Sequence, residues 1–490
     1  MTLSLGLDTA LSGLSTTADQ TAVVSRNVAR AKDPNASRKT ANLVTLPGGG
    51  VKLASITRAT DAALLDKMLG ATADAAGKKA IVTALDRLDQ TINDPELDAS
   101  PAALVGKLTD ALQAYSAAPQ DRVAASSAVA AGGNLARALN DASGVVQEVR
   151  TQADADIGAA VDSLNTLLAR LESVNAEIVK GTHRGADVTD YLDQRDQILA
   201  GISQEVGIRT LTRADNDIAV YTDSGVTLFD VRARAVTFAR TALYVPSTTG
   251  NAVFVDGVPI TGSTGSMLAS SGRLTGLTAV RDTAAVAYQN QLDEIALGLV
   301  EIFAESDQST TPTLPDAPGL FTYTGAAGVP ATGTLVVGLA ASIKINASVD
   351  PAQGGDATRL RNGGIAGNPA YVYNTTGAAA YTDRLQEFVD GLGAARAFDP
   401  AAQTTPAATL AGFAASSVAW LAEARQTAAN EADYRTTLLE RSSEALSEVT
   451  GVNIDEEMTL LLELERSYQA STKLISTIDS MLRALLAAAQ

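Results

Sequence analysis

The last part of the chain carries a regular apolar pattern that constrains the fold more than any other feature. Apolar or small residues recur there in alternating steps of three and four: Leu461, Leu464, Tyr468, Ser471, Ile475, Ile478, Leu482 and Leu485. This heptad spacing predicts a helix with one apolar stripe, which needs a partner because a lone helix leaves the stripe in water. Asn453, with Glu456 three residues later, predicts a capping box where that helix begins.

A weaker stripe with the same spacing lies at the other end of the chain. Residues 1–31 predict a helix whose stripe consists of Leu7, Leu11, Leu14, Ala18, Thr21, Ser25 and Val28. We expect the two terminal helices to pair, in parallel or antiparallel orientation, and Ile454 and Leu462 to remain available to neighbouring copies of the chain. The simpler alternative is a helical pair that closes one large domain within a single chain.

The segments between these ends alternate between helical and strand-like patterns. The clearest internal helix is predicted at 145–180, and another helical stretch at 380–450. The first of them places these apolar residues near one side: Val146, Val149, Ala153, Ile157, Val161, Leu164, Leu168, Leu171 and Ile178. The predicted fold is mainly α with β insertions: paired terminal helices, an elongated helical bundle and one or two small β domains. The predicted domains are 1–34 with 452–490 for the terminal pair, 35–205 with 272–306 and 376–451 for the helical bundle, 206–271 for a small β domain, and 307–375 for a second region rich in strands and loops.

The charge and the residue types exclude several classes of partner. The 490 residues include 37 Lys and Arg against 55 Asp and Glu, a formal net charge of −18, so a nucleic-acid or anionic-membrane partner is not expected. The chain has no cysteine, which excludes disulfides and thiolate metal sites. The absence of cysteine has two explanations: many bacterial proteins lack it, and a chain exported unfolded would be obstructed by a disulfide.

The sequence pattern predicts neither a cleaved secretory signal nor a membrane-spanning helix. No basic residue precedes Arg26, so a cleaved secretory signal is not predicted. No apolar run approaches the about 20 residues that span a bilayer. Taken alone, these two observations predict a cytoplasmic protein.

Residues suited to catalysis or cofactor binding are sparse. His183 is the one histidine, which is too few for a histidine metal site, and no nucleophile motif accompanies it. The Asp193/Asp196 and Asp154/Asp156 pairs are expected to bind arginines or cap helices rather than perform acid–base chemistry. Few aromatic residues and many small ones favour closely packed helices over a deep ligand pocket. We therefore predict no catalytic, metal or cofactor site, and a protein that is not an enzyme.

Both ends of the chain resemble the flagellar rod, hook and hook-associated proteins. Near the N-terminus the similar residues are Ser12-Gly13-Leu14, Asn27-Val28-Ala29, Pro34, Ser37 and Arg38. Near the C-terminus they are the box Gly451-Val452-Asn453-Ile454-Asp455-Glu456-Glu457 and the motif Tyr468-Gln469-Ala470-Ser471. Arg26, Arg30 and Lys32 depart from the family pattern, and we expect these cations to meet acidic surfaces of a neighbouring subunit.

Two internal segments narrow the resemblance to the FlgK branch of that family. Leu192-Asp193-Gln194-Arg195-Asp196 is similar to a segment typical of FlgK, and so is Arg281-Asp282 followed by Gln291-Leu292-Asp293. FlgK-like proteins form the first ring of the junction between hook and filament. The resemblance therefore implies a structural protein without cofactors.

The resemblance also implies partners and a location. The partners would be identical subunits in a ring, the hook protein, an FlgL-type hook-associated protein and an FlgN-type export chaperone. The location would be the extracellular flagellum, reached unfolded through the flagellar type III pathway, which replaces the cytoplasmic prediction. The residues expected to mediate assembly are Leu7, Leu11, Leu14, Asn27, Leu461, Leu464, Tyr468, Ile475, Ile478, Leu482 and Leu485.

Three alternatives stay open at the level of sequence. Another flagellar axial protein, either the hook protein or an FlgL type, would share the terminal helices. A secreted enzyme with a helical stalk would need a titratable cluster within 206–375. A cytoplasmic coiled-coil scaffold would share the heptads without being found in flagella.

Overall fold

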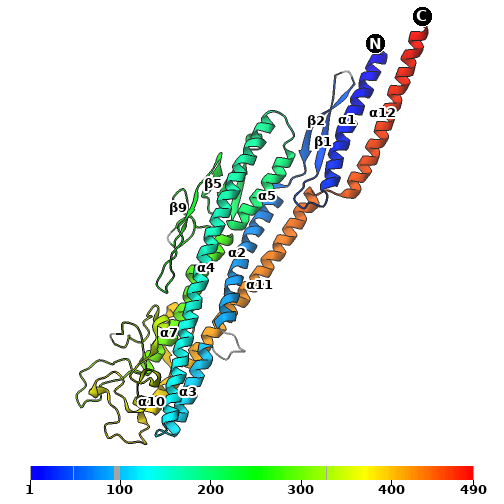
Figure 1. Cartoon of the computed structure of the whole chain (residues 1–490). Helices are drawn as coiled ribbons and strands as arrows, with labels where there is room; N and C mark the ends of the chain where they lie inside the picture. Colours follow the sequence, from blue (N-terminus) through cyan, green and yellow to red (C-terminus); the bar gives the residue numbers. More distant parts are fainter. Residues whose placement is uncertain (1, 48, 93–99, 264, 327, 489–490) are drawn as a thin grey trace.

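The protein is a long rod in which the two chain termini lie side by side at one end (Figure 1). The computed structural model describes residues 2–47, 49–92, 100–263, 265–326 and 328–488. Helices run along most of the rod, and the small sheets and loops lie against them. The predicted fold class, mainly α with β insertions and paired terminal helices, is confirmed.

Long helices form the frame. Their bounds are α1 Thr2–Arg30, α2 Ala62–Ile92, α3 Pro101–Ala117, α4 Arg122–His183, α5 Thr189–Glu205, α6 Arg273–Ala279, α7 Ala285–Ile302, α10 Asp383–Gly393, α11 Leu410–Thr450 and α12 Ile454–Ala488. The shorter helical turns are Ala214–Asn216, a π turn at Val280–Ala284, α8 Leu339–Ser342, Pro351–Gln353, α9 Arg359–Asn362, Pro369–Tyr371 and Pro400–Ala402.

The strands form small antiparallel sheets. Their bounds are β1 Lys39–Thr45, β2 Val51–Arg58, β3 Ile208–Thr212, β4 Ile218–Thr222, β5 Thr227–Asp230, β6 Arg232–Ala233, β7 Val236–Phe238, β8 Val253–Val255, β9 Val258–Pro259, β10 Phe321–Thr322, β11 Lys344–Ile345, β12 Arg396–Ala397 and β13 Ala407–Ala408. β1 and β2 form a hairpin. Within 206–271, β3-β4-β5-β6 form one sheet and β7-β8-β9 another, so strands occupy the segment where they were predicted.

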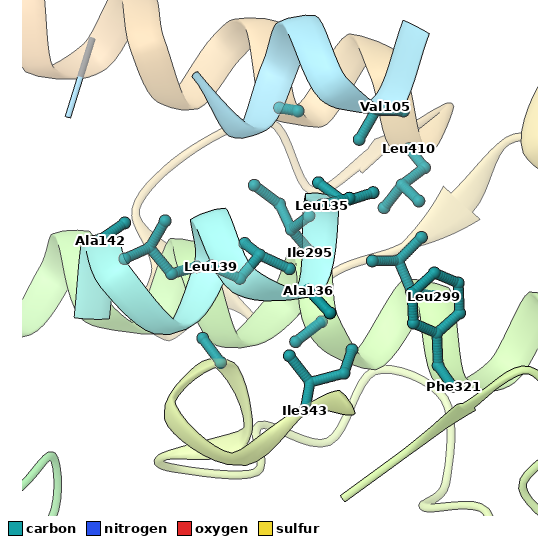
Figure 2. Close-up of a cluster of buried hydrophobic side chains, with 14 of the residues drawn as sticks. Val105, Leu135, Ala136, Leu139, Ala142, Ile295, Leu299, Phe321, Ile343 and Leu410 are labelled. Atoms are coloured by element: carbon teal, nitrogen blue, oxygen red, sulfur yellow. The ribbon is translucent and has the colours of Figure 1, made fainter. Parts of the chain in front are cut away.

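The helix α4 organises the body of the rod. It is 62 residues long and is capped by Asp121, whose side chain accepts a hydrogen bond from the Val123 N–H at 2.7 Å. Its buried residues recur at helical spacing and include all the apolar positions predicted for 145–180. The first half of α4 packs against α3, α7 and α8, as Figure 2 shows around Leu135, Leu139 and Ile343, and the second half packs against α5 and the β sheets.

The helical stretch predicted at 380–450 is interrupted. α10 ends at Gly393 and α11 begins at Leu410, with the β12–β13 pair and a turn between them. Asp399 caps that turn by accepting a hydrogen bond from Ala401 N–H at 2.8 Å, and Pro400 occupies its first position. The prediction of continuous helix was wrong there because proline favours a helix start and cannot continue one.

The helices α2 and α6 approach so closely that only glycine fits. A Cβ at Gly77 would lie 2.9 Å from the carbonyl oxygen of Gly272, and a Cβ at Gly276 would lie 2.2 Å from that of Gly77. The neighbouring atoms belong to the backbone, which cannot yield as a flexible side chain does. The expectation that small residues allow close helix packing is confirmed at this crossing.

This crossing yields a prediction with a control in the same helix. Gly77→Ala should lower the free energy of unfolding by about 1–3 kcal/mol, because the added methyl overpacks the crossing. Gly70→Ala, also in α2, should raise it by about 0.5–1 kcal/mol, because a Cβ there meets nothing within 4 Å and alanine favours helix. Urea unfolding followed by circular dichroism measures both. Equal effects of the two substitutions would contradict the close crossing.

Two buried carboxylates attach the loop-rich region 307–375 to α7 and the residues that follow it. Asp293 accepts hydrogen bonds from the Gly338 and Ala340 N–H groups, both at 2.8 Å, and burial raises the pKa of Asp293 to about 6. Glu305 accepts from Ile365 and Ala366 N–H, and burial likewise raises its pKa. Their buried backbone partners give both groups a structural role that sequence reasoning missed.

Candidate functional site: the paired terminal helices

α1 and α12 pack along each other in antiparallel orientation, which settles the choice left open by the sequence. A Cβ at Gly6 would lie 3.6 Å from Ile478 Cδ1, and one at Gly13 would lie 3.7 Å from Ser471 Oγ. Further along, Asn27 Nδ2 donates to Glu457 Oε2 at 3.0 Å. Contact positions that lie seven or fourteen residues later in α1 therefore meet positions that lie seven or fourteen residues earlier in α12. This is the pattern expected for an antiparallel heptad pair.

The contact face of α1 lies one residue away from the predicted stripe. Of the predicted assembly residues, Leu11 is 47% exposed, and Leu7 and Leu14 are only half-buried. Ala18 and Ser25, also in the predicted stripe, are exposed. The buried side chains in the part of α1 whose burial is described are Ala10, Thr16, Thr17, Val23, Val24 and Asn27. The predicted spacing of the contact residues in α1 was right, but the predicted side of the helix was wrong.

Polar contacts explain this rotation of α1. The side of α1 next to the α12 contact is tied to the hairpin: Thr16 Oγ1 donates to the Val51 carbonyl at 2.9 Å, and Val51 N–H donates to Ser12 Oγ at 3.2 Å. The hairpin and α12 together therefore enclose a face of small and hydroxylated residues. Small side chains let the helices approach, so the leucines are turned toward the edge of the contact.

The buried and half-buried apolar residues of α12 lie on the predicted side of the helix. Much of that apolar stripe is nevertheless exposed to solvent. Leu464 is buried, and Leu461, Ile475 and Ile478 are half-buried. Tyr468 is 44% exposed and Leu485 57%, with Leu482 at 36%. The helix α1 alone thus covers only part of the apolar surface of α12.

Further apolar side chains of α12 face solvent. Ile454 and Leu462, expected from the sequence to be available to neighbours, are exposed. Sequence reasoning missed four others: Met458, Leu474, Met481 and Leu486. The spacing of four between residues 454, 458 and 462 was the signal that could have identified a second stripe. Exposed apolar side chains gathered on one helix are typical of a surface that binds protein.

The two ends of the chain meet in a buried polar joint. Asn27 Nδ2 also donates to the Lys39 carbonyl at 2.8 Å, and Lys39 N–H donates back to Asn27 Oδ1 at 3.0 Å. Glu457, almost fully buried, accepts from Arg38 Nε at 2.7 Å. Arg38 N–H also donates to the Thr450 carbonyl. The N-terminal Asn-Val-Ala motif, the turn at Arg38 and the C-terminal box are thus brought together in space.

The start of α12 is capped as the sequence indicated. Asn453 Oδ1 accepts hydrogen bonds from Asp455 N–H at 3.0 Å and from Glu456 N–H at 3.4 Å. The three acidic residues at the beginning of the helix complement its positive end. The cap fixes where α12 begins after α11, and thereby where Glu457 enters the joint.

The residues considered for catalysis have structural partners. Asp193 and Asp196 bind Arg58, and Asp154 binds Arg281, as predicted for carboxylates that pair with arginines. His183 lies exposed beside Asp215, with Nε2 3.4 Å from the carboxylate. Within the described ranges, no group of three or more histidine, cysteine or acidic side chains is arranged to hold a metal. No described helix has the length and apolarity needed to cross a bilayer.

Comparisons with known proteins match the helical body and the C-terminal helix. Residues 85–311 match the family model of the flagellar hook-associated protein FlgK helical domain. Residues 443–488 match the flagellar basal body rod FlgEFG protein C-terminal model. The first match contains both internal segments that indicated FlgK, and the second contains α12 up to the last residue that the structure describes.

Individual relatives cover about half of the chain. The flagellar hook-associated protein 1 of Escherichia coli K12 is 24% identical over 270 residues, which are 52% of this chain and 47% of the relative. That of Salmonella typhimurium is 23% identical over 270 residues, 46% of its own length. The chain thus matches about half the length of these relatives. The flagellar hook junction protein FlgK of Burkholderia pseudomallei matches at 20% identity and a TM-score of 0.43, covering 53% of this chain and 46% of that one.

The helical-domain match, the C-terminal match and the two hook-associated relatives agree with the motifs at both ends of the chain. Over its helical body and its C-terminal helix, the chain is similar to flagellar hook-associated proteins of the FlgK family.

Proposed function

We propose that the protein is a structural axial subunit of the bacterial flagellum, which forms the hook–filament junction by self-assembly through its paired terminal helices. It acts by assembly and not by catalysis. The family match of the helical body and the names of the two relatives support this proposal.

The observation that carries the proposal is the apolar surface left uncovered on the terminal pair. Apolar side chains of α12 are exposed over its length: Ile454, Met458, Leu462, Tyr468, Leu474, Met481, Leu482, Leu485 and Leu486. Figure 1 places this pair at the end of the rod, beyond the helical body. Copies packed side by side would bury these side chains. Burial of apolar surface stabilises the assembly by about 25 cal/mol for each Å² removed from water. Assembly thus supplies the cover that one chain lacks.

The partners follow from this role. They are identical subunits in a ring, the hook protein on one side and an FlgL-type protein on the other, with an FlgN-type chaperone holding the C-terminal helix before export. The subunit travels unfolded through the flagellar type III pathway and functions outside the cell. A net charge of −18 disfavours nucleic acid and anionic membrane as competing partners.

The parts of the chain take separate roles in this proposal. The pair formed by 1–34 and 452–490 builds the inner tube. The bundle of 35–205, 272–306 and 376–451 surrounds it, and the regions 206–271 and 307–375 project outward. The antiparallel α1–α12 pair and the separate small sheets support this division.

A deletion strain tests the proposal. Cells without the gene should make hooks but no filaments and should release flagellin into the medium, and the intact gene should restore filaments. Electron microscopy of the cells and immunoblots of the medium provide the measurements. Normal filaments on the deletion strain would reject the proposal.

The deletion strain and the intact strain, together with a strain that lacks the FlgK-type subunit, separate the alternatives. Loss of the hook itself would indicate the hook protein. If the protein is of FlgL type, it should be missing from hook tips when the FlgK-type subunit is absent. A cytoplasmic scaffold would not be found in shed flagella, and a secreted enzyme would leave filaments intact.

A further inference from the structure

Four aspartates recur at every third position, from two residues before α5 into its first half. They are Asp187, Asp190, Asp193 and Asp196. Spacing of three residues places neighbouring side chains on the same side of a helix, where like charges repel unless cations lie between them. The side of α5 that carries them faces the N-terminal segment of the chain.

The cations that neutralise this acidic side come from α1 and the hairpin. Arg26 Nη2 lies 3.1 Å from Asp187, and Arg30 Nη1 lies 2.7 Å from Asp190. The expectation that these arginines meet a neighbouring subunit is therefore corrected: their aspartates belong to the same chain. Sequence distances of about 160 residues separate the partners.

The hairpin supplies the inner contacts. Lys39 Nζ is in direct contact with Asp190 and lies 3.6 Å from Asp193. Arg58 Nη1 lies 3.0 Å from Asp193 and 2.7 Å from Asp196. Ser37 Oγ donates to Asp193 Oδ1 at 2.5 Å. Asp193 therefore connects both strands of the hairpin to α5.

The cluster has a buried centre and an exposed rim. The side chains of Asp193 and Lys39 are 1% and 3% exposed, whereas that of Asp190 is 55% exposed. Exposed ion pairs contribute little each and weaken with salt, because ions screen them. Removal of one partner of a buried ion pair strongly destabilises the fold, because the other charge stays buried without a compensating charge.

The apolar cores of the body do not extend into the terminal pair. The two hydrophobic core clusters of the described residues contain no member from residues 2–58 or 452–488. A cleft of about 820 Å³ lies beside the joint, lined in part by Ser37, Arg58, Asp193 and Thr450. A junction that lies outside the apolar cores depends largely on its polar contacts for a fixed geometry.

We propose that the Asp187–Asp196 cluster and its four cations form an electrostatic latch that fixes the direction of the terminal helix pair relative to the helical body. The buried centre holds the joint at all salt concentrations, and the rim makes its rigidity sensitive to salt. The latch acts within one chain and goes beyond the proposed role in assembly.

Distance measurements on the full-length monomer test the latch. The chain has no cysteine, so Lys473→Cys in α12 and Arg170→Cys in α4, both exposed, provide two defined sites for spin labels. Electron paramagnetic resonance should give one narrow distance distribution. Asp193→Asn should abolish the narrow peak at every salt concentration. The double variant Asp187→Asn/Asp190→Asn should give a peak of the same width at about 0.05 M and at about 1 M salt, because the contacts that salt screens are gone. In the unsubstituted chain the peak should be narrower at the lower salt concentration than at the higher one.

Asp162→Asn, an exposed aspartate of α4, is the matched control and should leave the distribution unchanged. Circular dichroism verifies that each variant is folded, and the exposed rim pair keeps the test valid if Asp193→Asn fails to fold. A broad distribution in the unsubstituted chain would overturn the latch, as would a peak width in the rim variant that still depends on salt. Both readouts use the monomer, so failure of the latch is distinguishable from failure of hook binding.

Discussion

Leu464→Asp is expected to abolish binding to hooks while the helical body stays folded. Leu464 is the one buried apolar side chain in the described part of α12, with 6% of its surface exposed. Burial of a leucine contributes about 1.5–3 kcal/mol, and a buried carboxylate adds a desolvation cost. Leu464 belongs to neither core cluster of the body, so the substitution should destabilise only the terminal pair.

Thermal circular dichroism and co-sedimentation with isolated hooks measure the two parts of this prediction. The melting transition of the body should persist, and sedimentation with hooks should be lost. Ile475→Asp, at a half-buried position of the same stripe, should behave likewise. Glu463→Asp, an exposed neighbour, is the control and should bind normally.

Leu474→Asp separates the internal pair from contacts between copies. Leu474 is 57% exposed, so the charge should not disturb the isolated chain. If neighbouring subunits cover α12, this variant should nevertheless fail to assemble. Normal hook binding by both Leu464→Asp and Leu474→Asp would refute the assigned surface.

Arg281→Met is expected to destabilise the body by about 3–5 kcal/mol, the usual effect of removing one partner of a buried ion pair. Arg281 lies in the π turn before α7 and is fully buried. Its Nη1 binds Asp154 Oδ1 at 2.8 Å, and its Nη2 donates to the Asn251 carbonyl at 2.8 Å. Asp154 is also buried, so methionine would leave its charge without compensation.

The same contacts attach the β domain to α4. Asp154 also accepts from Tyr244 Oη at 2.8 Å, and Arg150 donates to the Thr248 carbonyl. In Arg281→Met, urea unfolding should shift to lower denaturant, and amide exchange should accelerate in residues 241–251. Arg234→Met removes an exposed pair with Asp256 and should change stability by less than about 0.5 kcal/mol.

A second substitution separates charge from packing. Arg281→Met/Asp154→Leu should recover part of the stability, because no unpaired charge is then buried. Equal stability of Arg281→Met and Arg234→Met would show that the buried network does not hold the β domain.

Periodicity predicted the helices well because burial of an apolar face imposes a repeat on the sequence. All the apolar positions expected on one side of 145–180 are buried in α4, and the capping pattern at Asn453 marks the true start of α12. Periodicity could not find the tight α2–α6 crossing at Gly77, because that contact joins distant segments through their backbones. Nor could it find the attachment of region 307–375 by Asp293 and Glu305.

The sequence by itself determined that both ends of this chain are helices with heptad stripes, and which side of α12 carries the main stripe. The antiparallel orientation and the rotation of α1 were decided only by the tertiary structure. The leucine stripe of α1 and the small-residue face beside it have the same spacing, so periodicity gives both equal weight. Hydrogen bonds from Asn27 to Glu457 and from Thr16 to Val51 select the second, because buried polar groups must find partners. Those partners are far apart in sequence and adjacent only in the folded chain.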